Sequence, residues 1–340
     1  MNGVTFPGLI LPGEQLAAAQ RVAGGGNNEL FRVELKGYGD VAVKRYSDGG
    51  QGMSERLKRE YTAVSFLNRA KISCVPTALK CDYAHGLGFY SWVDGRKLSS
   101  GDISEGEIDQ VVNFLSALSE LSLGEDAKDL PQAKDAGLSV ESVVMQIYNR
   151  LTRFEAVKSS NLELADFLDG RYARALLVVT EKLELECRRL GIGLSKELER
   201  CYQTLSPSDY GFHNALRGKN GKLTFLDFEY FGWDDPVKML CDFMWHPGMD
   251  LSVNCKRYFI EKAVDRFSCD PFFIMRLRLF YPLYGLIWAL ILLNDFLPNV
   301  WGARERAGIV TRNCKDEILQ AKLEKAGAYL SRIEGGELII

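Results

Sequence analysis

The chain has 340 residues, of which 46% are hydrophobic and 26% charged, and its formal net charge is −3 at pH 7. This balance excludes an intrinsically disordered chain, and the slight excess of acidic residues disfavours nucleic acid as a partner, since that needs a concentrated basic surface. Two lobes that share a cleft, or one large domain, are both compatible with this length.

The N-terminal region has the signals of a small antiparallel sheet. Residues 1–12 lack the basic start and long apolar run of a signal peptide, so we expect a cytoplasmic protein. An alternating run at 30–35 and an apolar run at 41–46 predict a hairpin, and apolar residues at helical spacing over 57–67 predict a helix. Short apolar runs near 74–81 and 87–93 complete the sheet.

Residues 94–340 read as mainly helical. The uncharged run 279–294 contains Pro282 and is shorter than the ~20 residues that cross a bilayer, so it predicts a buried core helix and no membrane span. One loop-rich stretch, 205–231, interrupts the helices and encloses a short apolar strand at 223–228. We therefore predict an α+β fold with two lobes, residues 1–93 and 94–340.

A glycine-rich turn precedes the predicted hairpin. It contains Gly25 and Gly26 and ends at Asn28. Backbone amides in such a turn can cover phosphate groups, although a glycine run alone is usually only a turn. Its order does not match GxGxxG, so we treat these three residues as candidate phosphate contacts that depend on the residues that follow.

A lysine and a glutamate downstream of this turn predict an ion pair. Lys44 ends the apolar strand, and Glu60 lies on the apolar stripe of the following helix, between Leu57 and Val64. A carboxylate at such a position needs a buried partner, and Lys44 answers that need. A lysine fixed in this way can reach the α and β phosphates of ATP, so we expect Lys44→Ala to weaken ATP binding and leave the fold intact.

The loop-rich stretch supplies further candidates. Asp209 and Asn214 are five residues apart on a predicted loop, and Asp227 and Glu229 follow a hydrophobic strand, where alternation places both carboxylates on one side. A carboxylate can orient an acceptor hydroxyl, while carboxamide and carboxylate oxygens suit Mg²⁺. We therefore predict a catalytic Asp209 with Asn214 and Asp227 as magnesium ligands.

Taken together, these residues resemble the aminoglycoside phosphotransferase and choline kinase-like family of small-molecule kinases, over most of the chain. The resemblance implies a protein-kinase-like fold whose N-terminal lobe, 1–93, binds ATP, with the adenine near Tyr90, Trp92 and Val93. It also implies transfer of the γ-phosphate to a hydroxyl of a small acceptor, such as a sugar, an aminoglycoside or an amino alcohol. The acceptor's identity, the choice between ATP and GTP and the oligomeric state stay open.

Two residues of the loop leave alternatives open. Members of that family commonly carry His two residues before the catalytic Asp, where this chain has Pro207, and His213 precedes Asn214 as either a catalytic group or a scaffold. Pro207 motivates one alternative, a nucleotide-binding pseudokinase or regulator of the same fold. A protein kinase is the second, although no Ala-Pro-Glu segment follows Asp227.

Overall fold

The structure, a computed structural model, describes residues 16–22, 28–36, 39–46, 53–249, 251–306, 310 and 314–336. The chain divides into two compact units. The first unit contains residues up to 101 together with 207–232, and the second contains 102–206 together with the residues from 233 onward. We expected one uninterrupted lobe from residue 94, whereas 207–232 belongs with the N-terminal sheet.

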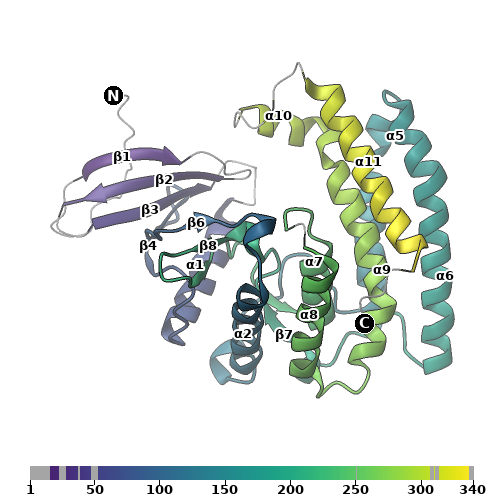
Figure 1. The fold of residues 1–340 in the computed structure, drawn as a ribbon, viewed down its shortest axis with the longest axis horizontal. Coiled ribbons are helices and arrows are strands. Elements are labelled where there is room, and N and C mark those ends of the chain that lie inside the picture. The colour runs from purple at the N-terminus through teal and green to yellow at the C-terminus, as the bar shows by residue number, and fades with distance from the viewer. Residues whose placement is uncertain are drawn as a thin grey trace. The chain divides into compact units, whose positions relative to one another are not determined.

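The first unit is built on a five-stranded sheet with the order β1-β2-β3-β5-β4 (Figure 1). Its elements are β1 (Leu16–Val22), β2 (Asn28–Leu35), β3 (Gly39–Tyr46), α1 (Met53–Arg69), β4 (Ala78–Asp82) and β5 (Leu87–Ser91). All four strand pairings are antiparallel. The predicted hairpin is confirmed as β2 and β3, and the predicted helix as α1. The strand β1 was not predicted.

Alternation along β2 and β3 creates the core of this sheet. Phe31, Val33 and Leu35 point to the same face as Val41 and Val43, and all five are at most 3% exposed. The residues between them stay polar or partly exposed. One face of the hairpin is therefore fixed by burial, which sets the register that pairs Lys44 with Leu30 and with Gly88 on the next strand.

A second, three-stranded sheet of order β6-β8-β9 explains why 207–232 joins the first unit. Its strands are β6 (Arg96–Lys97), β8 (Ala215–Arg217) and β9 (Leu223–Phe225), and the turn η5 (Phe212–Asn214) leads into it. Backbone hydrogen bonds between segments about 120 residues apart cannot be read from local composition. The predicted strand 223–228 ends at Phe225, because the chain turns at Asp227 with a φ of +66°.

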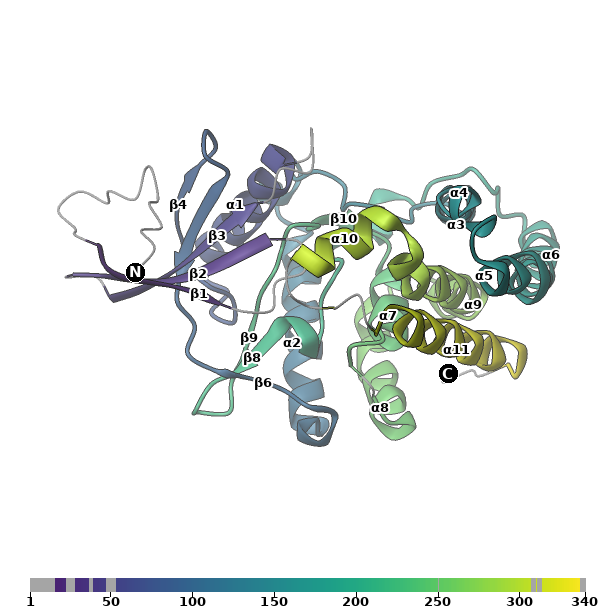
Figure 2. The ribbon, with the colours of Figure 1, turned by 90° about the horizontal axis from the view of Figure 1, so that it is seen from above.

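The second unit is mainly helical (Figure 2). Its helices are α2 (Glu105–Leu121), α3 (Val140–Thr152), α4 (Glu155–Lys158), α5 (Leu162–Asp166), α6 (Ala173–Leu190), α7 (Pro236–Trp245), α8 (Val253–Val264), α9 (Phe273–Leu292), α10 (Pro298–Arg306) and α11 (Lys315–Glu334). Shorter helical turns are η1 (Ser100–Asp102), which spans the boundary, η2 (Glu125–Ala127), η3 (Phe167–Tyr172), η4 (Arg200–Tyr202), η6 (Asp265–Phe267) and η7 (Leu293–Phe296). Two short strands, β7 (Thr204–Ser206) and β10 (Gly232–Asp234), pair with each other.

The helix α9 is the central core element of the second unit and packs against α7 and α11 (Figures 1 and 2). Its side chains are buried on most sides, as the apolar run 279–294 predicted. Residues Phe273–Phe296 have the length and hydropathy of a membrane span, but 67% of the apolar window is buried within the protein. Burial of this kind is typical of a core helix.

Candidate active site

Lys44 lies at the centre of a buried charge cluster in the first unit. Its ammonium nitrogen is 2.6 Å from Glu60 Oε2 on α1 and 2.7 Å from Asp227 Oδ1 after β9. Glu229 Oε2 lies 3.8 Å away. The predicted ion pair between Lys44 and Glu60 is therefore present, and the structure adds two carboxylates from a segment more than 180 residues further along the chain.

A tyrosine hydroxyl contacts the same carboxylate oxygen of Glu60 as Lys44 does. Tyr46 donates a hydrogen bond to Glu60 Oε2, and the hydroxyl of Tyr90 lies 3.2 Å from that of Tyr46. A Cβ atom at Gly88 would come within 2.8 Å of the Tyr90 ring, so only glycine lets this ring reach its position. Tyr90, which was expected near the adenine, thus points its hydroxyl into the network around Glu60.

The other residues of the predicted adenine contact lie at the end of the sheet. Trp92 donates from its ring nitrogen to Asp94 Oδ1 at 3.0 Å, and the Arg32 guanidinium lies 4.8 Å from the centre of its ring. The side chain of Trp92 is therefore already packed, and Val93 is partly exposed beside it. Contact of these residues with adenine stays a prediction.

The segment after β9 presents Asp227 and Glu229 to Lys44 by a turn rather than by strand alternation. Asp227 has a left-handed φ of +66°, which is uncommon for a residue with a side chain. Glu229 is 1% exposed and accepts a 2.7 Å hydrogen bond from Asn28 Nδ2, while Arg56 Nη1 lies 3.6 Å from its other oxygen. Asn28 is therefore part of the cluster. Gly25 and Gly26 lie outside the described residues.

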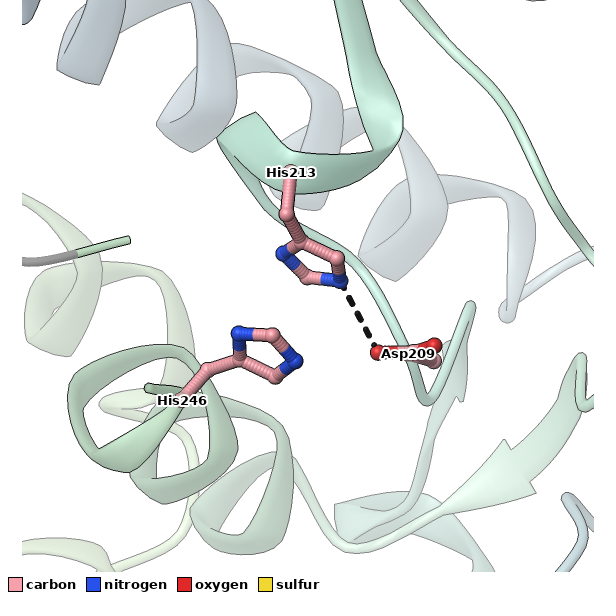
Figure 3. Close-up of side chains that lie close together, drawn as sticks. All are labelled: Asp209, His213 and His246. Atoms are coloured by element: carbon pink, nitrogen blue, oxygen red, sulfur yellow. Dashed lines mark hydrogen bonds and ion pairs between the residues drawn. The ribbon is translucent and has the colours of Figure 1, made fainter. Parts of the chain in front are cut away.

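The loop before β8 holds Asp209 by contacts from both sides. A tight turn places Ser208 at a φ of +67° and lets the Asp209 amide donate to the Pro207 carbonyl at 2.9 Å. His213 Nε2 lies 3.0 Å from Asp209 Oδ1 (Figure 3), and since an ionised carboxylate only accepts, the ring donates. The side-chain amide of Asn214 donates to the Asp209 carbonyl at 2.9 Å.

The hairpin formed by β8 and β9 joins these two groups of residues. Ala215 pairs with Phe225, and the Leu226 amide donates to the Asn214 carbonyl at 2.8 Å. The candidate ligand Asn214 thus accepts this hydrogen bond with its backbone, and the candidate ligand Asp227 directly follows its donor, Leu226. This hairpin therefore links the loop that carries Asp209 and Asn214 to the segment that brings Asp227 to Lys44.

The charges of the cluster change its proton affinities in opposite directions. Burial by itself lowers the pKa of Lys44, but the charges of Asp227, Glu60 and Glu229 outweigh it, so this pKa is raised well above its ordinary value. Burial raises the pKa of Asp227, Lys44 opposes this, and Glu60 and Glu229 raise it again, to about 6. For Glu229, burial acts upward but Lys44 and Asn28 prevail, and its pKa is lowered.

The donor set fits a divalent cation that prefers oxygen ligands. Carboxylate oxygens of Glu60, Asp227 and Glu229 lie within 4.8 Å of one another, and negative charges outnumber positive ones even when Arg56 is counted with Lys44. Asn28 Oδ1 is buried and has no hydrogen-bond partner among the described residues. An excess of hard oxygen donors beside a lysine favours a cation such as Mg²⁺ together with an anionic ligand.

The excess of negative charge in the cluster predicts that substitutions of Asp227 and of Glu229 change the stability of the nucleotide-free protein in opposite directions. Asp227→Asn should raise the melting temperature by about 2 °C, or roughly 1 kcal/mol, because it removes a repelled charge, and Asn tolerates a positive φ. The gain is modest because solvent reaches 35% of this side chain and screens it. Glu229→Gln should lower the melting temperature, since it weakens contacts with Lys44 and Arg56. Thermal unfolding of both variants would contradict this account if the two shifts had the same sign.

Sequence reasoning missed two members of the cluster, although local signals existed for both. Tyr46 is two residues after Lys44 on β3, so strand alternation turns both side chains to one face. Arg56 is four residues before Glu60 on α1, which places it one helical turn away on the same face. Neither pattern identifies a partner, because Tyr46 needs α1 to bring Glu60 beside β3 and Arg56 needs the distant segment that contains Glu229.

Comparison with known proteins places this arrangement in context. A model of a phosphotransferase enzyme family matches residues 18–253. No curated protein matches the chain. Among solved structures, choline kinase LicA from Streptococcus pneumoniae is similar with a TM-score of 0.58 at 14% identity, covering 93% of this chain and 94% of that one.

Two further structures show the same likeness. A choline/ethanolamine kinase family protein from Mesorhizobium loti has a TM-score of 0.59 at 16% identity, covering 94% of this chain and 92% of its own. An ADP-bound aminoglycoside phosphotransferase, APH(2'')-Ib, has a TM-score of 0.58 at 14% identity, covering 94% and 95%. At such identities the likeness shows the fold, and the predicted two-lobed, protein-kinase-like α+β fold is confirmed.

Proposed function

Because the chain belongs to the phosphotransferase enzyme family, we propose that it transfers the γ-phosphoryl group of ATP, with Mg²⁺, to a hydroxyl of a small polar molecule. The observation that carries the proposal is the pairing of Lys44 with Glu60 and Asp227 on the same unit that holds Asp209 and Asn214. The nucleotide is supported by similar structures described as complexes with AMP or ADP.

Each residue then has a role that its surroundings support. Lys44, kept charged by its carboxylate neighbours, contacts the α and β phosphates. Asp227 and Asn214 hold Mg²⁺, which when bound neutralises charge that develops on the phosphoryl oxygens. Glu60 fixes Lys44, and Asp209 accepts a hydrogen bond from the acceptor hydroxyl and aligns it for attack.

The position of His213 supports an active loop in spite of Pro207. The residue two places before Asp209 is a buried proline, so it offers no side-chain donor to orient the loop. His213 instead contacts the Asp209 carboxylate directly at 3.0 Å. We infer that His213 positions Asp209, which favours an enzyme over a nucleotide-binding regulator of the same fold.

The acceptor is proposed as a small hydroxyl compound of the sugar, aminoglycoside or amino alcohol class. The similar structures are described as choline and ethanolamine kinases and aminoglycoside phosphotransferases, and one is a spectinomycin phosphotransferase in complex with ADP and spectinomycin. These substrates are those of the similar proteins, and for this chain the acceptor class is our proposal. A cytoplasmic location and the absence of nucleic-acid and membrane partners stay predictions for this chain.

A screen of acceptors tests the proposed function. The protein is incubated with Mg²⁺ and ATP and a library of sugars, aminoglycosides and amino alcohols, and ADP release is measured with and without EDTA. We expect at least one acceptor to stimulate ADP release, and EDTA to abolish it. ATP binding by calorimetry without turnover on any acceptor would instead support the regulator, and phosphorylation of a protein substrate would support a protein kinase.

A further inference from the structure

A basic hollow of about 780 Å³ opens in the first unit, beside the sheet formed by β6, β8 and β9. One wall is the chain that enters β6, and the other is the hairpin between β8 and β9. Its lining residues are Asp94, Gly95, Arg96, Arg217, Gly218, Lys219 and Gly221. None of them belongs to the charge cluster around Lys44 or to the loop around Asp209.

Positive charge dominates the lining of this hollow. Three of the lining side chains are cationic, and Asp94 is the one carboxylate among the described lining residues. Asp94 already accepts a 3.0 Å hydrogen bond from the Trp92 ring and lies 4.0 Å from Arg32. Lys97 and Lys222 add charge on the same small sheet, although the chain as a whole has a net charge of −3.

The strand register brings two of these cations face to face. Arg96 pairs with Arg217 across β6 and β8, so both side chains project from the same face of the sheet, while Lys97 pairs with Leu216 on the other face. An anion bound on this face of the sheet would lie within reach of both guanidinium groups.

Glycines keep the two walls close and the hairpin tight. A Cβ atom at Gly95 would come within 2.9 Å of Leu216 Cβ and 3.1 Å of the Arg217 carbonyl oxygen, so glycine permits the approach of the two strands. Gly221, at a φ of +77°, donates to the Gly218 carbonyl at 3.0 Å. The cationic side chains therefore project from short, hydrogen-bonded backbone.

We propose that this hollow binds a small anion that carries a diphosphate group, with Arg96 and Arg217 contacting its oxygens. Planar guanidinium groups match phosphate oxygens through paired hydrogen bonds, and Lys219 contributes a third positive charge. A diphosphate group can present oxygens to both guanidinium groups at once. The site is separate from the nucleotide contacts proposed for Lys44, and it does not rest on the proposed phosphotransfer.

Calorimetric titration with inorganic pyrophosphate, at low ionic strength and in EDTA, tests this site. Without a divalent cation, the carboxylates around Lys44 repel pyrophosphate from that cluster, so the measured binding reports on the hollow. We expect binding to the wild type and at least tenfold weaker binding to the double variant Arg96→Gln, Arg217→Gln. Lys222→Gln is the matched control, since it removes a charge from the same hairpin outside the lining, and it should change the affinity less than twofold.

Three outcomes overturn the proposal. They are the absence of measurable pyrophosphate binding to the wild type, binding that the double variant retains, and an equal loss in Lys222→Gln, which would indicate diffuse attraction only. Melting temperatures accompany each titration and show whether each variant is folded. Arg96→Gln alone, at an exposed position, continues the test if the double variant does not fold.

Discussion

Replacing Asp209 with Asn is expected to lower kcat about 10³-fold, within the range typical for loss of a positioned general base, and to leave ATP affinity within about twofold. The carboxylate is held by His213 at 3.0 Å, so its orientation toward an acceptor is preset. A carboxamide of the same shape cannot take up the hydroxyl proton. Steady-state kinetics with the acceptor found by screening, together with calorimetric titration of ATP, measures both quantities.

Variants of His213 separate positioning from catalysis in this test. His213→Ala removes the hydrogen bond to Asp209 and should lower kcat about tenfold, while His213→Gln keeps a donor and should restore part of the loss. If Asp209→Asn retained more than about a tenth of the activity, Asp209 would have no catalytic role. If both His213 variants matched the wild type, the 3.0 Å contact would be structural only.

Replacing Lys44 with Ala is expected to destabilise the protein by about 3–5 kcal/mol, the cost of leaving a buried ion pair without one partner. From the sequence we expected this change to leave the fold intact, but Lys44 lies between Glu60, Asp227 and Glu229. Glu60 is 5% exposed and cannot recover its solvation by moving to the surface. Denaturant unfolding of the wild type and the variant measures the change.

A second substitution tests the cause of that loss. Adding Glu60→Gln to Lys44→Ala removes the carboxylate that lost its partner, so the double variant should regain part of the stability, about 1 kcal/mol or more. Lys97→Ala, at an exposed position of the same unit, serves as the control and should change stability by less than about 0.5 kcal/mol. A Lys44→Ala variant as stable as this control would refute the burial argument.

Much of the candidate site follows from local patterns. Lys44 at the end of an apolar strand and Glu60 on the apolar stripe of a helix predict each other, because each is costly to bury without the other. The spacing of Asp209 and Asn214, with Asp227 after the next strand, predicts the rest. The hairpin of β2 and β3 is equally local, since alternation has a period of two and one of its faces is buried.

Other features depend on residues that are distant in sequence. The strand β1 pairs with β2 without a strong apolar pattern, and β6 pairs with β8 across about 120 residues. The turn at Asp227, which ends β9 early, replaces the expected alternation as the means by which two carboxylates reach Lys44. A short stretch of sequence contains neither the partner strand nor the charged side chain that stabilises such a turn.

The sequence by itself determined which residue types the site contains and their order along the chain, because burial costs and strand and helix periods act over a few residues. Only the tertiary structure decided that Tyr46, Tyr90, Arg56 and Asn28 complete the cluster, and that His213 contacts Asp209. The physical reason is that hydrogen bonds and charge interactions depend on distance in space, which the packed chain alone sets.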